Sequence, residues 1–275
     1  MKKDLFSLKG KNIVVTGASG LLGRQHVDAI ALYGGTPILL DLKSSVLDIQ
    51  VNELKEKYKI EAFGYVVNIT DEISVQKNCQ MLIENFGKID GLINNAANNP
   101  KVENSSSKNF SRLENFPLAV WEQDVAVGLT GSFLCAKYYG HAISKNKDGG
   151  TIVNISSDLG LIAPDQRLYR VEGLPEEQQP VKPVTYSIVK SGLIGLTRYL
   201  ATYWADKNVR CNAICPGGVE NNQNDAFISE LIKRIPVNRM ARLDEYQGLL
   251  IFLLSDASSY LNGSIIAADG GRSAW

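Results

Sequence analysis

Residues 12–23 read NIVVTGASGLLG, and this stretch decides the fold. A run of apolar and β-branched residues leads into Gly17, Gly20 and Gly23, and the helical pattern of residues 21–33 begins inside the turn. Glycines permit a tight turn and a close backbone approach, while the first helical turn directs N–H groups and its dipole at a phosphate. The stretch therefore predicts a strand, a nucleotide-phosphate turn and a helix. An ordinary glycine-rich turn is the alternative.

Asp41 ends the next β-rich run, 18 residues after Gly23. An acid about 20 residues beyond a dinucleotide turn accepts hydrogen bonds from the adenine ribose, and its charge repels a 2′-phosphate. Asp41 therefore predicts NAD rather than NADP. Arg24 and Lys43 lie close enough in sequence to weaken this preference. A solvated acid at the end of a strand is the alternative.

Seven β-rich runs alternate with longer amphipathic stretches along the whole chain. The predicted strands are residues 12–16, 36–42, 61–68, 91–94, 151–156, 210–215 and 264–269, and the predicted helices are residues 21–33, 46–58, 72–86, 118–145, 186–204 and 244–254. This alternation is typical of a parallel α/β sheet. We expect a Rossmann-type, doubly wound sheet of seven strands in a single domain, residues 1–275. Polar loop expansions interrupt the pattern at residues 98–115 and 158–183.

Composition excludes several classes of protein. The 275 residues carry 29 Lys and Arg against 29 Asp and Glu, so no global field favours polyanions such as nucleic acid, or an electrostatic membrane anchor. A hydrophobic content of 44% is too high for a disordered chain. No signal-peptide pattern or membrane-spanning run is found, so we expect a cytoplasmic protein. The four cysteines are predicted to be buried thiols, and no metal site is expected.

Tyr186 and Lys190 open a predicted helix at i and i+4, which places their side chains one turn apart on one face. A tyrosine needs a nearby cation to exchange protons near neutral pH, and Lys190 is placed to provide it. Ser157 follows the fifth strand and brings a hydroxyl to the same edge of the sheet. A packed tyrosine with a solvated lysine is the alternative for this pair taken alone.

Together these residues resemble the short-chain dehydrogenase/reductase family from about Leu8 to the C-terminus. Three further elements carry the likeness: Asn95-Ala96-Ala97 after the fourth strand, Pro216-Gly217 after the sixth, and Asp269-Gly270-Gly271 near the end. The resemblance implies that Tyr186 exchanges a proton with the substrate while a hydride moves to or from a nicotinamide. It also implies that Ser157 polarises the substrate oxygen, and that Lys190 holds the nicotinamide ribose and lowers the pKa of Tyr186.

The residues expected to bind the cofactor follow from the glycine turn, Asp41 and the resemblance. They are Gly17, Ser19, Gly20, Leu22, Gly23, Asp41, Leu42, Asn68, Ile69, Asn95, Ala96, Tyr186, Lys190, Pro216, Gly217 and Val219. Asn68 and Ile69 stand where the family usually has Asp-Val, and we expect contacts with the adenine there to survive the change. The catalytic residues are expected to be Ser157, Tyr186 and Lys190.

Three departures from the family pattern bear on function. Gly128 stands where the family carries a fourth catalytic residue, an asparagine, so we expect a slower or differently routed proton relay. The glycine spacing of residues 17–23 resembles that of the sugar-nucleotide branch of the family, although the chain ends at Trp275 without that branch's further domain. Ser157 and Tyr186 lie 29 positions apart, more than the usual short link, and the inserted residues predict either a polar wall or lid over the substrate or a solvated surface excursion.

Substrate class is indicated by the segment after Pro216, where amides at residues 221–224 precede a helical piece ending at Lys233 and Arg234. With Arg167 and Arg170 these groups favour a polar, sugar-like or anionic substrate; a solvated helix face is the alternative. The segment 158–190 also looks similar to oxidoreductases of bacterial surface-polysaccharide and flagellin-glycan sugar pathways.

The resulting prediction is an NAD(P)-dependent alcohol or carbonyl oxidoreductase. The alternatives are an epimerase or dehydratase of a nucleotide sugar that retains NAD, and a non-catalytic dinucleotide-binding regulator. Apolar residues on more than one side of the helical segments 118–145 and 186–204 predict a homotetramer or homodimer.

Overall fold

The computed structural model describes residues 4–98 and 109–275. Seven parallel strands form one sheet in the order β3-β2-β1-β4-β5-β6-β7, so the predicted Rossmann-like single-domain fold is confirmed. The strands are β1 (Asn12–Thr16), β2 (Thr36–Asp41), β3 (Phe63–Val66), β4 (Gly91–Asn94), β5 (Gly150–Ile155), β6 (Val209–Pro216) and β7 (Ile265–Ala268). All seven coincide with predicted runs. The edge strand β3 is shorter than predicted because only β2 pairs with it, over four residues.

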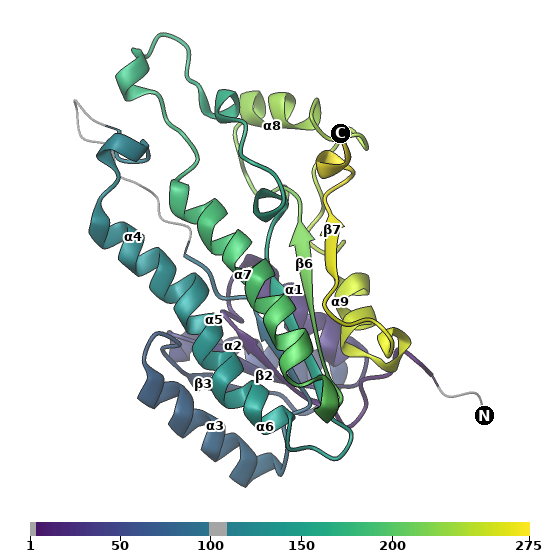
Figure 1. Ribbon diagram of the computed structural model, residues 1–275. Coiled ribbons are helices and arrows are strands. Elements are labelled where there is room, and N and C mark those ends of the chain that lie inside the picture. The colour runs from purple at the N-terminus through teal and green to yellow at the C-terminus, as the bar shows by residue number, and fades with distance from the viewer. Residues whose placement is uncertain (1–3, 99–108) are drawn as a thin grey trace.

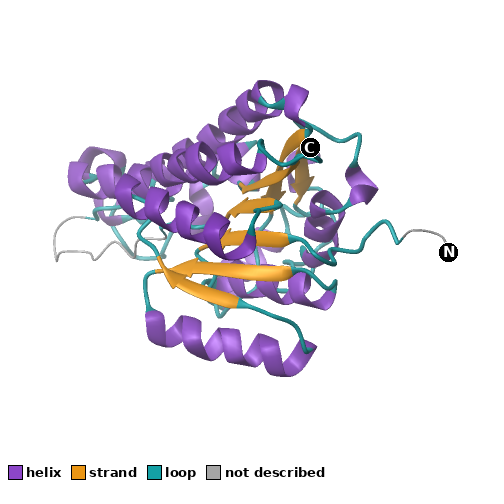
Figure 2. Ribbon diagram, turned by 90° about the horizontal axis from the view of Figure 1, so that it is seen from below, coloured by secondary structure: helices purple, strands orange, loops and turns teal. Residues whose placement is uncertain are grey.

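Helices cover both faces of the sheet (Figure 2). They are α1 (Leu21–Leu32), α2 (Ser44–Tyr58), α3 (Glu72–Phe86), α4 (Leu118–Val125), α5 (Gly131–Cys135), α6 (His141–Ile143), α7 (Val184–Tyr203), α8 (Asp225–Ile232) and α9 (Gln247–Leu254). Alternating strand residues divide between two cores. Val14, Ile38 and Leu92 pack with α3, α5, α6 and α7, whereas Ile13, Leu39 and Ile93 pack with α1, α2 and α9.

The predicted long helix, residues 118–145, is one helical run from α4 to α6 (Figure 1). Two π-helical turns, Ala126–Thr130 and Ala136–Gly140, join its α-helical parts. Such wider turns often occur at functional sites, and the first of them contains Gly128. Across the described ranges, no helix combines the length and apolarity that a membrane span needs. All four cysteines are free and buried, as predicted.

His26 gives the fold a defined acid sensitivity. The imidazole in α1 is fully buried, and burial lowers its pKa from 6.5 to about 4. Below about pH 6.5 His26 is protonated in the unfolded chain but stays neutral in the folded protein. The free energy of unfolding therefore keeps its full value above pH 6.5 and decreases as the pH falls toward 4. We expect a loss of about 3 kcal/mol from this group by pH 4. Urea unfolding of the unchanged protein and of His26→Leu, at neutral and acid pH, measures it, and equal pH dependence in the two proteins would contradict it.

Candidate active site

A cavity of about 970 Å³ opens along the carboxyl ends of the strands. Loops after β1, β3, β4, β5 and β6 line it, together with the end of β2 and the first turn of α7, and it spans the switch point between β1 and β4. The sequence-predicted residues that line it are Gly17, Ser19, Gly20, Leu22, Asp41, Leu42, Asn68, Ile69, Asn95, Ala96, Ser157, Tyr186, Lys190, Pro216, Gly217 and Val219. Among the residues predicted for the site, Gly23 is the one that does not line the cavity.

The glycine turn is shaped by two close backbone approaches. Gly17 has φ +61°, and a Cβ there would lie 2.8 Å from the Ala96 Cα. A Cβ on Gly23 would lie 2.1 Å from the Gly17 carbonyl oxygen. Both positions therefore require glycine, and Gly23 lets α1 start against the turn. Leu21 and Leu22 of the first turn of α1 line the cavity, and a helix leaves the N–H groups of its first turn free to bind a phosphate.

Asp41 lies at the far end of the cavity from Tyr186. Its carboxylate accepts hydrogen bonds from the backbone N–H groups of Ser19 and Leu42, both at 2.8 Å. The Gln50 side chain supports the same turn, because its Nε2 donates to the Ala18 carbonyl at 3.0 Å while Ser19 Oγ donates to its Oε1 at 3.2 Å. Sequence analysis missed Gln50, whose only signal is a polar residue on the buried face of a predicted helix.

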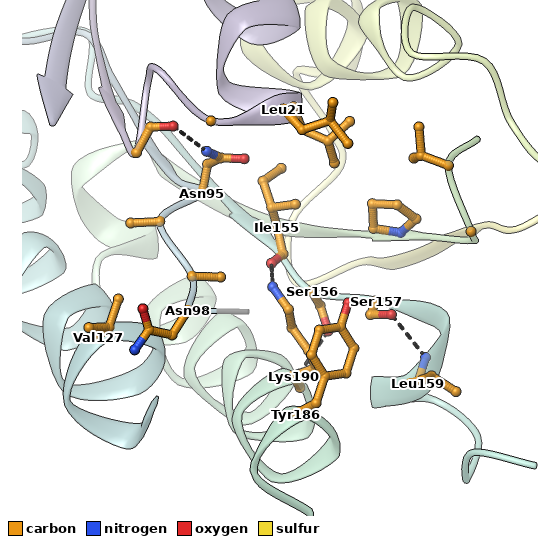
Figure 3. A pocket seen from close by; sticks show the side chains of 18 of the residues that line it. Leu21, Asn95, Asn98, Val127, Ile155, Ser156, Ser157, Leu159, Tyr186 and Lys190 are labelled. Atoms are coloured by element: carbon orange, nitrogen blue, oxygen red, sulfur yellow. Dashed lines mark hydrogen bonds between the residues drawn. The ribbon is translucent and has the colours of Figure 1, made fainter. Parts of the chain in front are cut away.

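Asn95 locks the glycine turn to the end of β4. Its Nδ2 donates to the carbonyl oxygens of Thr16 and Gly17, at 3.0 Å each, and one such bond of the Asn95 side chain is drawn in Figure 3. Thr16 Oγ1 accepts from the backbone N–H of Asn95 at 3.0 Å. These bonds tie together two loops at the switch point. Asn95 therefore shapes the floor of the cavity as well as lining it.

Tyr186 and Lys190 project from the start of α7 into the cavity, and the Tyr186 hydroxyl points toward Ser157 (Figure 3). Lys190 Nζ donates to the Ile155 carbonyl at 2.8 Å. Burial lowers the pKa of Lys190 to about 8. Burial also raises the pKa of Tyr186, against a smaller lowering by the Ser157 hydroxyl. Lys190 Nζ lies 5.8 Å from the centroid of the Tyr186 ring, and the lowering of the Tyr186 pKa by Lys190 stays a prediction.

Ser157 is part of a buried polar cluster that sequence analysis did not identify. Its Oγ donates to Asp158 Oδ1 at 2.8 Å, and Asp158 Oδ2 forms an ion pair with Arg272 Nη1 at 2.7 Å. All three side chains are buried. A buried carboxylate needs such a partner, since an unpaired charge in the interior is costly. The pair therefore sets the orientation of the Ser157 hydroxyl.

Comparisons with known proteins agree with this geometry. A family model described as short chain dehydrogenase matches residues 11–169, and one described as Enoyl-(Acyl carrier protein) reductase matches residues 176–273. The chain is 32% identical to an NADP-dependent mannitol dehydrogenase of Alternaria alternata, over 98% of this chain and 94% of that protein. The chain belongs to the short-chain dehydrogenase/reductase family.

Two other likenesses span almost the whole length. The chain is 27% identical to post-translational flagellin modification protein A of Campylobacter coli, over 96% of this chain and 98% of that protein. A crystal structure of a short-chain type dehydrogenase/reductase from Mycobacterium marinum superposes with a TM-score of 0.83 at 27% identity, covering 98% and 97% of the two chains. The protein is thus a short-chain NAD(P)-dependent dehydrogenase/reductase. These relatives differ in function and leave its sub-family and substrate unresolved.

Gly128, the departure from the family's asparagine, faces Val189 on α7. A Cβ at position 128 would lie 2.4 Å from Val189 Cγ1, so the glycine makes room for the valine directly before Lys190. The Gly128 carbonyl accepts from Ser132 Oγ at 3.0 Å. A small second cavity of about 50 Å³ lies between these helices, and its lining includes Gly128, Val189 and the buried Asp124, whose Oδ2 accepts from Thr185 Oγ1.

The long loop 158–183 has two parts. Leu168 and Tyr169 line the main cavity, and the Tyr169 ring packs against Phe227 of α8 with centroids 5.6 Å apart. Residues 171–179 form a separate turn outside the lining, closed by the Gln179 side chain on the Val171 backbone at 2.8 and 2.9 Å. Residues 168 and 169 thus form part of the cavity wall, and residues 171–179 form a surface excursion (Figure 1), while a polar lid over the substrate stays a prediction. The companion expansion 98–115 falls largely outside the described residues.

The segment after Pro216 was predicted to line the cavity with amides and cations, and this prediction is wrong for most of these side chains. The helix α8 turns its apolar face, Phe227 and Leu231, into the cavity, and its charged face points away. Asn224 caps α8, and Gln223 Nε2 bonds to the Val219 carbonyl at 2.8 Å. The four predicted cations lie outside the lining in ion pairs: Arg167 and Arg234 with Asp165, Arg170 with Glu176, and Lys233 with Glu230.

Proposed function

We propose that the protein interconverts an alcohol and a carbonyl group on a polar, sugar-like substrate, with Tyr186 as the proton-transferring residue. The observation that carries this proposal is the convergence of Tyr186, Ser157 and Lys190 on one end of a cavity whose other end is the glycine turn and Asp41. Reacting groups and cofactor-binding groups thus share one continuous space. A bound nicotinamide supplies or accepts the hydride.

Each side chain has a separate task in this proposal. Tyr186 donates its proton to the substrate oxygen during reduction and takes it back during oxidation. Ser157 turns its hydroxyl from Asp158 to the same oxygen, which holds the developing charge in place. Lys190 stays anchored on the Ile155 carbonyl and presents its remaining N–H groups to the ribose and to Tyr186. The buried Asp158–Arg272 pair keeps Ser157 oriented between turnovers.

A polar substrate is supported by the groups around Tyr186 and by one relative. Asp158, Lys182, Arg272 and Asn98 all line the cavity near the reacting residues. The similar protein from Alternaria alternata is named a mannitol dehydrogenase, which acts on a polyol. The likeness to a flagellin modification protein supports a role in bacterial surface-glycan sugar chemistry. A panel of polyols, ketoses and sugar acids, assayed by the absorbance of the reduced nicotinamide with both cofactors, tests the activity.

Assembly as a homotetramer or homodimer is part of the same proposal. Large apolar side chains are exposed along the two long helical runs, Phe133 on α5 and Ile188, Tyr199 and Tyr203 on α7. Tyr199 and Tyr203 stack with ring centroids 5.4 Å apart, which makes a flat apolar surface. A second copy of the chain would cover it, and light scattering measures the mass. The free, buried cysteines suit a cytoplasmic location.

Cofactor preference depends on Asp41 in this proposal, which favours NAD over the NADP named for the Alternaria alternata relative. We expect Asp41→Ser to lower kcat/KM for NAD by about 10-fold or more and to raise it for NADP, because the ribose hydroxyls lose a charged acceptor and a 2′-phosphate loses a like charge. Steady-state kinetics with each cofactor measure the ratio. An unchanged ratio would show that Asp41 serves only the backbone of Ser19 and Leu42.

A further inference from the structure

Lys182 is a cation that the proposed mechanism does not use. Its Nζ lies 3.8 Å from the centroid of the Tyr186 ring, nearer than that of Lys190. The backbone N–H of Lys182 donates to Gln166 Oε1 at 2.8 Å, just before α7 begins at Val184. The side chain is partly buried and lines the main cavity. Lys182 is therefore held over the ring of Tyr186.

Within residues 4–98 and 109–275, no carboxylate or hydrogen-bond acceptor pairs with the Lys182 ammonium. Four other charged groups lie around Tyr186, namely Lys190, Arg272, Asp158 and Asp124, whose Oδ2 accepts from Thr185 and whose Oδ1 has no hydrogen-bond partner among the described residues. Arg272 is paired with Asp158 at 2.7 Å, and Lys190 donates to the Ile155 carbonyl at 2.8 Å. Among the described residues, three cations (Lys182, Lys190 and Arg272) thus face two carboxylates (Asp158 and Asp124) around Tyr186, which leaves one positive charge in excess. Burial lowers the pKa of Lys182, which shows the cost of holding this charge without a partner.

A buried ammonium loses the favourable free energy of its hydration, and an anion or strong hydrogen-bond acceptors compensate for this loss. The face of the Tyr186 ring compensates for only a part of it. Leu168, Phe227 and Leu231 line the same cavity as Lys182, and apolar side chains around a charge pair lower the local dielectric constant and strengthen the pair. The arginines and lysine outside the lining are neutralised by their own carboxylates. Lys182 is therefore the group suited to an anionic ligand.

We infer that Lys182 binds an oxyanion of the substrate, so that the preferred substrates are sugar-derived alcohols or ketones carrying a carboxylate or a phosphate. This inference rests on the proposed oxidoreductase function. Bound beside Tyr186, the acidic group fixes which carbon of the substrate reaches the proton-transferring hydroxyl. A single excess positive charge balances a carboxylate more closely than a doubly charged phosphate. Phosphate is often bound by an arginine, and the one arginine in this part of the described cavity lining, Arg272, is already paired with Asp158.

Binding is the first test, because it does not depend on turnover. Isothermal titration of the NADH-saturated protein with gluconate, glucose 6-phosphate and mannitol compares the two acids with a neutral polyol. We expect one of the acids to bind at least about 10-fold more tightly than mannitol, and Lys182→Met to weaken that acid by about 10- to 100-fold. Lys182→Arg should retain part of the affinity. Lys233→Met, which removes an exposed lysine outside the cavity, is the matched control and should change nothing.

Turnover separates this inference from the proposed function. Lys182→Met should lower kcat/KM for the acidic substrate at least about 10-fold more than for a neutral polyol, and the pH profile with the polyol should keep its position. Equal losses on acidic and neutral substrates, or a displaced pH profile, would overturn the inference and assign Lys182 to Tyr186 itself. Turnover of neutral polyols without any Lys182-dependent preference for acids would refute the inference and leave the proposed function intact. Lys182-dependent binding of an acid without turnover of any substrate would support the inference about Lys182 and refute the proposed oxidoreductase function.

Discussion

Tyr186→Phe should lower kcat by about 10³-fold while the dissociation constant of NADH stays within about threefold of its original value. The substitution removes one hydroxyl and keeps the ring, which packs beneath the Lys182 ammonium. The cofactor contacts predicted at the glycine turn and Asp41 lie at the other end of the cavity and are not touched. A large loss of rate without loss of cofactor is the signature of a proton-transferring group.

Stopped-flow kinetics give the rate, and quenching of protein fluorescence gives the affinity for NADH. Tyr260→Phe is the matched control, because Tyr260 is fully exposed and lies outside the cavity. Retention of more than a tenth of the rate would exclude Tyr186 as the acid and base. Absence of turnover in the unchanged protein, with NADH still bound, would instead favour the non-catalytic alternative. Interconversion of sugars without net change in added NAD(H) would favour the epimerase.

The fold could be predicted because its signals are local. Each strand appears as a short β-rich run, and the glycine turn of residues 17–23 fixes the first crossover. Parallel strands carry their loops to one edge, so residues after β1, β4, β5 and β6 were expected to meet and do so. The bounds of β3 and of the long helical run were predicted less well, since pairing at a sheet edge and π-helical turns depend on neighbours that the sequence does not reveal.

Residues that act through distant partners were missed. Asp158 and Arg272 are 114 positions apart, and each alone reads as an ordinary charged residue. Lys182 stands four residues before Tyr186, a spacing that could have suggested it, but its lack of a partner is a property of the fold. Conversely, the cations predicted near the substrate were chosen for their position in the sequence, and in the structure they form ion pairs with nearby carboxylates outside the cavity lining. Charge in a sequence predicts a binding site only once its pairing is known.

Gly128→Asn should reduce activity strongly, although it restores the side chain that the family carries. The Cβ alone would lie 2.4 Å from Val189 Cγ1, so the Val189 side chain, α7 or the helical run around Gly128 must shift. Overpacking of this kind costs about 1–3 kcal/mol of stability. Val189 directly precedes Lys190, and a displacement of about 1 Å at a reacting group lowers rates by about 10²-fold. Thermal melting and kcat, measured together, follow both effects.

The double variant Gly128→Asn/Val189→Ala decides what the glycine means for proton transfer. If the harm done by Gly128→Asn comes from the clash with Val189, truncation of the valine makes room for the asparagine side chain. Stability and kcat of the double variant should then both be higher than those of Gly128→Asn. Val189→Ala alone serves as the control, since it leaves a small void and no clash. With the clash relieved, any change in the pH profile of kcat reports the carboxamide's share in the relay. Failure of the double variant to recover, with the single variant still folded, would show that position 128 limits the reaction by chemistry rather than by packing.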